Sequence, residues 1–166
     1  MAYTGISTVE TREAAWLCVS TDSLPSLLTA SGGPWDVIQA FWTRTPATQK
    51  TQVYVMSLDL QDVRSANIRI MPHYEITLEL HWPVRQTSSP VAEQEQQAFR
   101  NAIDLLIQRI RGPLGDKTHG GFLSVGEDPR SPGVRVVIEP PWTTIPAGKE
   151  LRALITYYAD DLEIND

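Results

Sequence analysis

The sequence predicts an α+β fold: a mostly antiparallel sheet flanked by helices. Three observations carry this prediction. Candidate strands cluster along the chain instead of alternating one by one with helices, which disfavours a doubly wound parallel sheet. Residues 74–84 alternate between apolar and polar side chains, and residues 90–111 repeat apolar side chains at helical spacing. The 166 residues are 42% hydrophobic, which fits a single domain over 1–166 with its own core.

The first 34 residues form an N-terminal helical elaboration, ahead of a unit over 35–166 that holds the sheet and the long helix. Ser7 and Glu10 fit a capping box, which predicts a first helix over residues 9–19. Residues 22–25 predict a second helix start, with proline in its first turn, and the Gly-Gly-Pro at 32–34 ends the region. The apolar residues assigned to the buried sides of these helices are Val9, Trp16, Leu17, Leu24, Leu27 and Leu28.

The middle of the chain is predicted to be rich in strands. Residues 35–43 fit a strand or a helix, residues 51–60 carry β-formers, and residues 67–71 are a third candidate. The strongest strand covers residues 74–84, because side chains along a strand point alternately to its two faces. Its expected core face holds Ile76, Leu78, Leu80, Trp82 and Val84, and its polar face holds Glu75, Thr77, Glu79 and His81.

The long helix is predicted over residues 90–111. Ser89 is placed as its N-cap and Pro90 in the first helical position. Acidic residues lie near its start and Arg109 and Arg111 near its end, which suits the helix dipole. The glycine and proline at 112–113 stop it. Its predicted buried stripe consists of Ala98, Phe99, Ala102, Ile103, Leu106 and Ile110.

The C-terminal third is predicted to hold three strands separated by turns. The two prolines at 140–141 interrupt the sheet, because proline cannot donate to a central ladder. The acidic tail at 160–163 is expected to be exposed. In order, we expect a loop over 114–121, a strand over 122–125, a turn over 127–133, a strand over 134–139, a turn over 143–149 and a strand over 151–158.

The net charge and the lack of targeting signals disfavour several classes of protein. The net charge of -6 disfavours sequence-specific binding to duplex DNA, which depends on basic surface. An acidic surface does suit a protein that lies near DNA without adhering to it. Residues 1–5 lack the features of a signal peptide, and no apolar run approaches the length of a membrane span. We therefore expect a cytoplasm-like compartment and no membrane partner.

The sequence gives little support for a catalytic nucleophile or a metal site. Cys18 is the only cysteine, lies in the apolar stretch 14–19, and is expected to be a buried, inert thiol. His73 and His81 would be about 26 Å apart along a continuous strand, too far to share a metal ion. His119 lies in a glycine-containing loop beside Asp116 and is interpreted as a solvated residue, not a ligand or base.

The sequence also lacks a close carboxylate pair and a phosphate-binding loop. Glu75 and Glu79 would be about 13 Å apart along their strand, more than a glycosidase pair requires. The segment 112–121 follows a helix and lacks the phosphate-loop pattern. The sequence thus predicts no catalytic residue, no metal site and no cofactor, and a protein that is not an enzyme. Trp142, after two prolines, is the best candidate for an exposed contact anchor in a loop.

Four segments resemble the second half of the tail terminator proteins of long-tailed (siphovirus-type, actinophage-like) bacteriophages. They are YEITLELHW at 74–82, LLIQRIR at 105–111, GGFLSVGE at 120–127 and LRALITYY at 151–158. The resemblance covers residues 74–163. The first third departs from the family's minimal plan, because it is longer and rich in tryptophan.

This resemblance implies a tail-terminator-like fold and a structural virion protein of the phage neck, assembled in the host cytoplasm. Subunits would form a homohexameric ring on the last ring of tail tube protein, stop tube growth and join head-completion or connector proteins. Genomic DNA would pass through the lumen without sequence-specific binding. The alternatives are another head–tail connector or head-completion protein of the neck, with a ring of six or twelve copies, a small-molecule enzyme or binding domain, and a monomeric stress or regulatory protein. The expected interface residues are Asp116, Lys117, His119, Asp128, Arg130 and Trp142.

Overall fold

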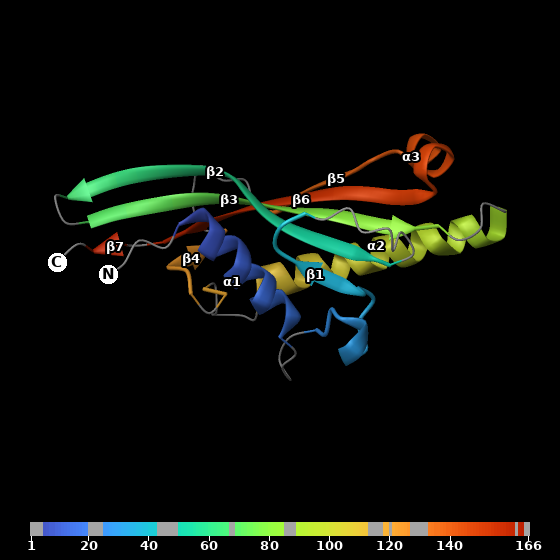
Figure 1. Ribbon diagram of the computed structural model, residues 1–166, viewed down its shortest axis with the longest axis horizontal. Helices are drawn as coiled ribbons and strands as arrows, with labels where there is room; N and C mark the ends of the chain where they lie inside the picture. Colours follow the sequence, from blue (N-terminus) through green and yellow to red (C-terminus); the bar gives the residue numbers. More distant parts are fainter. Residues whose placement is uncertain are drawn as a thin grey trace.

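The computed structural model describes residues 5–19, 25–42, 50–66, 69–84, 89–112, 118–119, 121–126, 133–161 and 163–164. It confirms an α+β fold with a mixed, mostly antiparallel sheet and three α-helices among these residues (Figure 1). The elements in chain order are α1 (Ile6–Cys18), the 3-10 helix η1 (Thr29–Ser31), β1 (Val37–Gln39), β2 (Gln52–Ala66), β3 (Arg69–Pro83), α2 (Ser89–Arg111), β4 (Ser124–Val125), β5 (Arg135–Ile138), α3 (Pro141–Gly148), β6 (Glu150–Asp160) and β7 (Glu163–Ile164).

The strands form one sheet whose main path is β1-β2-β3-β6-β4. Strand β5 pairs with β6, and β7 pairs with β3. Only the β1–β2 pairing is parallel among the described strands; the others are antiparallel. The strands β2 and β3, and likewise β5 and β6, follow each other along the chain and are antiparallel neighbours in the sheet, as expected for clustered strands.

Strand β3 confirms the strongest prediction and extends it. The candidates at 67–71 and 74–84 belong largely to one strand, Arg69–Pro83. Its alternation places one set of side chains in the core: Tyr74, Ile76, Leu78, Leu80 and Trp82 are all buried. The predicted strand at 51–60 is also longer than expected, because β2 continues to Ala66 as the hairpin partner of β3.

Helix α2 confirms the predicted long helix. It begins at Ser89, so this residue lies inside the helix and does not precede it as a cap. The predicted stripe packs into the core, with Phe99, Ala102, Ile103, Leu106 and Ile110 buried and Ala98 partly buried. Burying a stripe of this kind removes apolar surface from water and holds the helix on the sheet.

The start of α1 differs from the prediction. The helix begins at Ile6 with Gly5 as its N-cap, and no side chain caps it. Ser7 lies within the first turn, where its carbonyl accepts a hydrogen bond from the Thr11 hydroxyl. The capping-box prediction is wrong because Gly5, at φ 77°, takes the backbone conformation that leads into the helix.

Of the second predicted helix, only the short 3-10 helix η1 is present among the described residues. Residues 25–27 are not helical, and Leu28 forms a parallel bridge with Trp35. Residues 22–24 lie outside the described residues. The missing side chain of Gly33 allows this arrangement, because a Cβ there would lie 2.3 Å from the Leu27 backbone carbonyl. Of the segment 35–43, residues Val37–Gln39 form a strand, β1.

Two C-terminal predictions are also corrected. The region expected to be a turn at 143–149 is largely the helix α3, in which Pro141 occupies an early position that needs no N–H donor. The acidic tail is partly buried: Asp160 ends β6 and pairs with His73, and the backbone N–H of Asp161 donates to the Pro72 carbonyl. Strand pairing with β3 and β4 draws this segment into the sheet.

The sheet is covered mainly on one face. Helices α1 and α2 lie on the same side of the long strands, whereas α3 lies at the end of the β5–β6 hairpin (Figure 1). The core forms between these two helices and the sheet, with Trp35 packed edge-on against Trp82 at 5.3 Å. We call the opposite side, which carries Tyr54, Glu79 and Leu154 in one cross-strand row, the open face. None of the described helices has the length and apolarity to cross a bilayer.

Candidate functional site

Helix α3 presents the most exposed large apolar side chain. Trp142 is 78% exposed and lies in the first turn of α3, not in a loop as predicted. The hydroxyl of Thr143 donates to the Pro140 carbonyl at 2.7 Å and supports this turn. A tryptophan held on a short rigid helix is suited to anchor a protein contact, because little side-chain entropy is lost on binding. The predicted exposure is confirmed; the contact remains a prediction.

A shallow groove of about 450 Å³ runs between α3 and the outer side of α2. Its walls are apolar on the α3 side, and α2 contributes one guanidinium, from Arg100. The lining residues are Gln96, Arg100, Pro141, Trp142, Ile145 and Pro146. A groove this open suits a protein partner better than a small molecule, whose pocket buries most of its surface.

A second exposed apolar group lies at the β1–β2 edge. Phe41 and Trp42 directly follow β1 and are 57% and 52% exposed, and Leu58 in β2 is 68% exposed. The Trp42 ring contacts Tyr54 at 6.4 Å. Leu58 lies at a register shift between Ser57 and Asp59. Its side chain points to the open face because Val53, Val55 and Ser57, at alternate positions of the strand, face the core.

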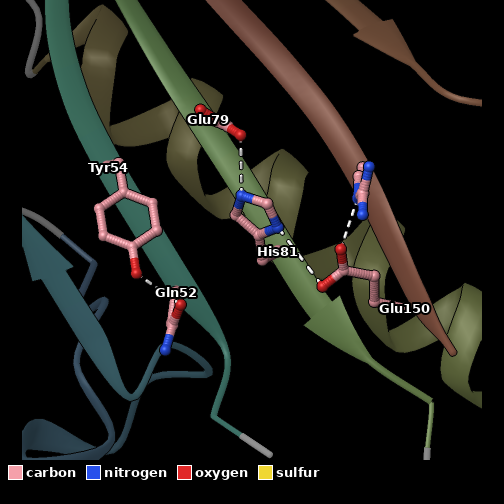
Figure 2. A network of polar contacts seen from close by, with 6 residues as sticks. Gln52, Tyr54, Glu79, His81 and Glu150 are labelled. Carbon is pink, nitrogen blue, oxygen red and sulfur yellow. Dashed lines mark hydrogen bonds and ion pairs between the residues drawn. The ribbon is translucent and has the colours of Figure 1, made fainter. Parts of the chain in front are cut away.

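Polar side chains form a network on the open face, shown in Figure 2. His81 lies between two carboxylates, with Nε2 at 2.9 Å from Glu79 and Nδ1 at 3.4 Å from Glu150. Arg152 donates to Glu150, and this hydrogen bond raises the pKa of its guanidinium. The Tyr54 hydroxyl donates to Gln52 at 2.6 Å. Glu79 thus contacts the His81 ring, and Glu150 contacts both His81 and Arg152, as is typical of cross-strand pairing on a polar sheet surface.

The two histidines of β3 contact different acids, as their predicted separation requires. His73 pairs with Asp160, while His81 pairs with Glu79 and Glu150. Within the described residues, no three His, Cys, Asp or Glu side chains are grouped to hold a metal ion.

His119 is buried, so its predicted role as a solvated, contact-making loop residue is wrong. One ring nitrogen contacts the Glu13 carboxylate, and the other lies 2.6 Å from the Ile110 carbonyl oxygen. The ring stacks on Trp16 with centroids 3.7 Å apart. The Ile110 carbonyl can only accept, so this ring nitrogen donates to it, while the other ring nitrogen shares a hydrogen bond with the Glu13 carboxyl group. The expectation failed because loop position says nothing about a partner in α1.

Other buried polar groups complete this cluster. The Tyr157 hydroxyl donates to Glu13 at 2.8 Å, and burial followed by the Glu13 charge raises the pKa of Tyr157 well above its ordinary value. Arg109 lies over the Trp16 ring at 4.5 Å and donates to the Trp16 carbonyl at 2.6 Å. Burial lowers the pKa of Arg109. We call Glu13, Trp16, Arg109, His119 and Tyr157 the buried polar cluster.

This cluster connects α1, α2, β6 and residue 119 inside the molecule. Glu13, Arg109, His119 and Tyr157 are all buried, so a substrate has no access to them in this arrangement. Its role is structural: it ties the N-terminal helix to the unit that follows. Cys18 lies near it, donates to the Ile38 carbonyl and has a pKa raised by burial, which disfavours the reactive thiolate.

Four of the predicted interface residues, Asp116, Lys117, Asp128 and Arg130, lie outside the described residues. Of the other two, Trp142 is on the surface and His119 is in the interior. No known family model matches the chain, and a comparison with curated proteins likewise gave no match.

Proposed function

We propose that the chain is a structural virion protein that forms a ring at the head-proximal end of a phage tail tube. The ring ends tube growth and joins tail to head, with DNA passing through its lumen. The observation that carries this proposal is Trp142, a 78% exposed aromatic anchor fixed on α3 beside an apolar groove. Together with the apolar lining of the groove, the Trp142 ring forms an exposed apolar patch that a protein partner can cover.

The segments that resemble tail terminators support the proposal, because they form one packed unit. Strand β3 pairs with β6 continuously from His73 to Pro83, which joins the segments at 74–82 and 151–158. The end of α2 packs on the same core through Leu106 and Ile110. The likeness therefore lies in contiguous structure and not in scattered surface positions.

Charge supports the same proposal. At -6 per chain, six copies would carry -36, and acidic surface around a channel repels the DNA backbone and eases transit. The open face includes Glu75 and Glu79, which project from β3 away from the core. Such a face is suited to border a lumen without holding DNA.

The test is assembly with the tail tube protein of the same phage. We expect electron micrographs and mass measurement to show sixfold rings that cap one end of each tube and prevent further growth. A twelvefold ring that ignores tubes would indicate a head connector instead. A chain that stays a single copy with tubes present would refute the proposal.

Trp142→Ala tests the anchor. We expect weaker assembly with the fold retained, because the exposed ring supports no core contact. Val19→Ala, at another exposed apolar residue, is the matched control and should leave assembly unchanged. Circular dichroism checks the fold of both variants, and unchanged assembly of Trp142→Ala would remove the anchor assignment.

A further inference from the structure

We infer that the groove beside Trp142 receives a patch of β2 and β3 from a second copy of this chain. Leu58 and Asp59 of β2 and Glu75 of β3 form this patch, which we call the acidic patch. The inference rests on the proposed ring and names the two surfaces that join its subunits.

The groove offers an apolar wall and one cation. Its α3 side consists of Pro141, Trp142, Ile145 and Pro146, and its α2 side includes the guanidinium of Arg100. The Arg100 side chain is exposed, and it forms no ion pair with a carboxylate of the described residues. A partner that fits the groove should therefore bring an apolar side chain with an acid next to it.

The acidic patch has this composition. Leu58 is 68% exposed, and its neighbour Asp59 is exposed as well. Asp59 is directly opposite Glu75 in the β2–β3 register, and like charges opposite each other destabilise a strand pair. Within the described part of the chain, no cation pairs with either carboxylate, and His73, two positions from Glu75, contacts Asp160. A cation from another molecule would therefore relieve the repulsion between the two acids.

The acidic patch cannot reach the groove of its own copy. Helix α3 ends directly before β6, whose first residue, Glu150, pairs with Pro83 of β3. Glu75 lies eight positions back along β3, which corresponds to about 26 Å. Figure 1 likewise shows α3 at one end of the long strands and the hairpin end of β2 and β3 at the other. Any contact between the two surfaces therefore joins two molecules.

The two surfaces are complementary in both shape class and charge. In the docked pair, Leu58 lies against the Trp142 ring, and the Arg100 guanidinium lies between Asp59 and Glu75. The planar fork of arginine presents five donors, so it can bind two carboxylates at once. Covering Leu58 and Trp142 also removes apolar surface of both copies from water.

The contact is heterologous, because the acidic patch and the groove are different surfaces. A copy whose groove is filled still presents its acidic patch to a further copy, and such head-to-tail contacts close into a ring when the rotation permits. A twofold pairing of like surfaces would set Arg100 against Arg100, or the acids against each other. The charges therefore favour a ring over a symmetric dimer.

Cross-linking tests the docking directly. Gln61→Cys beside the acidic patch and Gln97→Cys beside the groove replace exposed side chains and place one thiol next to each surface. In a Cys18→Ser background, a short bismaleimide should convert assembled rings of the double variant into a ladder of covalent oligomers larger than dimers. Each single variant should give no cross-linked species, because its thiols do not face each other. Gln61→Cys with Gln108→Cys, about 16 Å further along α2 than Gln97, is the matched control and should give no ladder.

Charge exchange gives an independent readout. Arg100→Glu, and separately Asp59→Lys with Glu75→Gln, should each raise the protein concentration needed for half-maximal ring formation by about tenfold. Combining all three substitutions in one chain should restore most of the assembly, because the opposite charges at each contact have then changed places. Arg135→Glu, at an exposed cation of β5, is the matched control and should leave assembly unchanged. Circular dichroism checks the fold of every variant.

The outcomes separate this inference from the ring itself. Covalent dimers from either single cysteine variant would indicate twofold contacts and overturn the head-to-tail docking. Rings without a ladder, together with loss of tube capping by Arg100→Glu, would assign the groove to the tail tube protein and overturn the docking, while the ring proposal stands. Failure of the unmodified chain to assemble with tail tube protein would instead refute the proposed function.

Discussion

At the scale of single residues, the chain buries a contact between a carboxyl group and a histidine that are far apart in sequence. Glu13 contacts His119 and accepts a hydrogen bond from Tyr157, and the backbone carbonyl of Ile110 completes the contacts of the imidazole ring. Buried polar groups are tolerated only when they are hydrogen-bonded. The pair therefore fixes where α1 lies, and removing either partner leaves buried polar atoms without a hydrogen bond.

Glu13→Gln should lower the free energy of unfolding by on the order of 3 kcal/mol, because the buried His119 and Tyr157 lose the carboxyl group to which both are hydrogen-bonded. Denaturant unfolding followed by circular dichroism measures this change. Glu93→Gln, at an exposed position of α2, is the matched control and should shift the free energy by less than about 0.5 kcal/mol. Equal effects of the two variants would mean that the buried pair contributes nothing.

Because of Tyr157, we expect the free energy of unfolding to fall at alkaline pH. Its pKa is raised in the folded chain by burial and by Glu13, whereas the unfolded hydroxyl ionises near pH 10. Above about pH 10 the unfolded chain releases a proton that the folded chain retains, so stability is complete below that pH and falls as pH rises. Tyr157→Phe should flatten this fall in unfolding free energy, measured from pH 8 to 11. An unchanged slope would show that Tyr157 is not responsible.

At the scale of elements, the turn between η1 and β1 depends on a missing side chain. A Cβ on Gly33 would lie 2.3 Å from the backbone carbonyl of Leu27, a distance that only backbone movement relieves. This close approach lets Leu28 bridge Trp35 and places β1 beside β2. The position of β1 in the sheet therefore depends on Gly33.

Gly33→Ala should cost more than about 2 kcal/mol of unfolding free energy. Gly148→Ala is the matched control, because a Cβ there makes ordinary contacts of 3.6 Å or more. The control should be neutral or stabilising by up to about 1 kcal/mol through helix propensity. Thermal unfolding of both variants measures the difference, and a harmless Gly33→Ala would contradict the packed turn.

At the scale of the whole molecule, protection from hydrogen exchange should follow depth in the sheet. Strands β3 and β6 are paired on both sides and form the core, so their amides should exchange slowest. Strand β7, with two register pairs to β3, should exchange fast. Exchange of the β3 amides as fast as that of the β7 amides would contradict this order.

The local sequence pattern was enough to predict the buried faces of elements that pack one face on the core along their whole length. The alternation in β3 and the 3.6-residue stripe in α2 predicted their buried faces, because each element packs one face on the same core. The exposure of Trp142 followed from the prolines before it. These signals are local, so a single sequence contains them.

The remaining features depend on partners distant in the chain. His119 is buried because α1 supplies Glu13 and Trp16, and Asp160 is buried because β6 reaches β3 and β4. The order of the strands in the sheet likewise follows from pairing between distant segments. Periodicity reports which face of an element is apolar, while burial of a polar group and the identity of an edge follow from contacts between elements that no local pattern records.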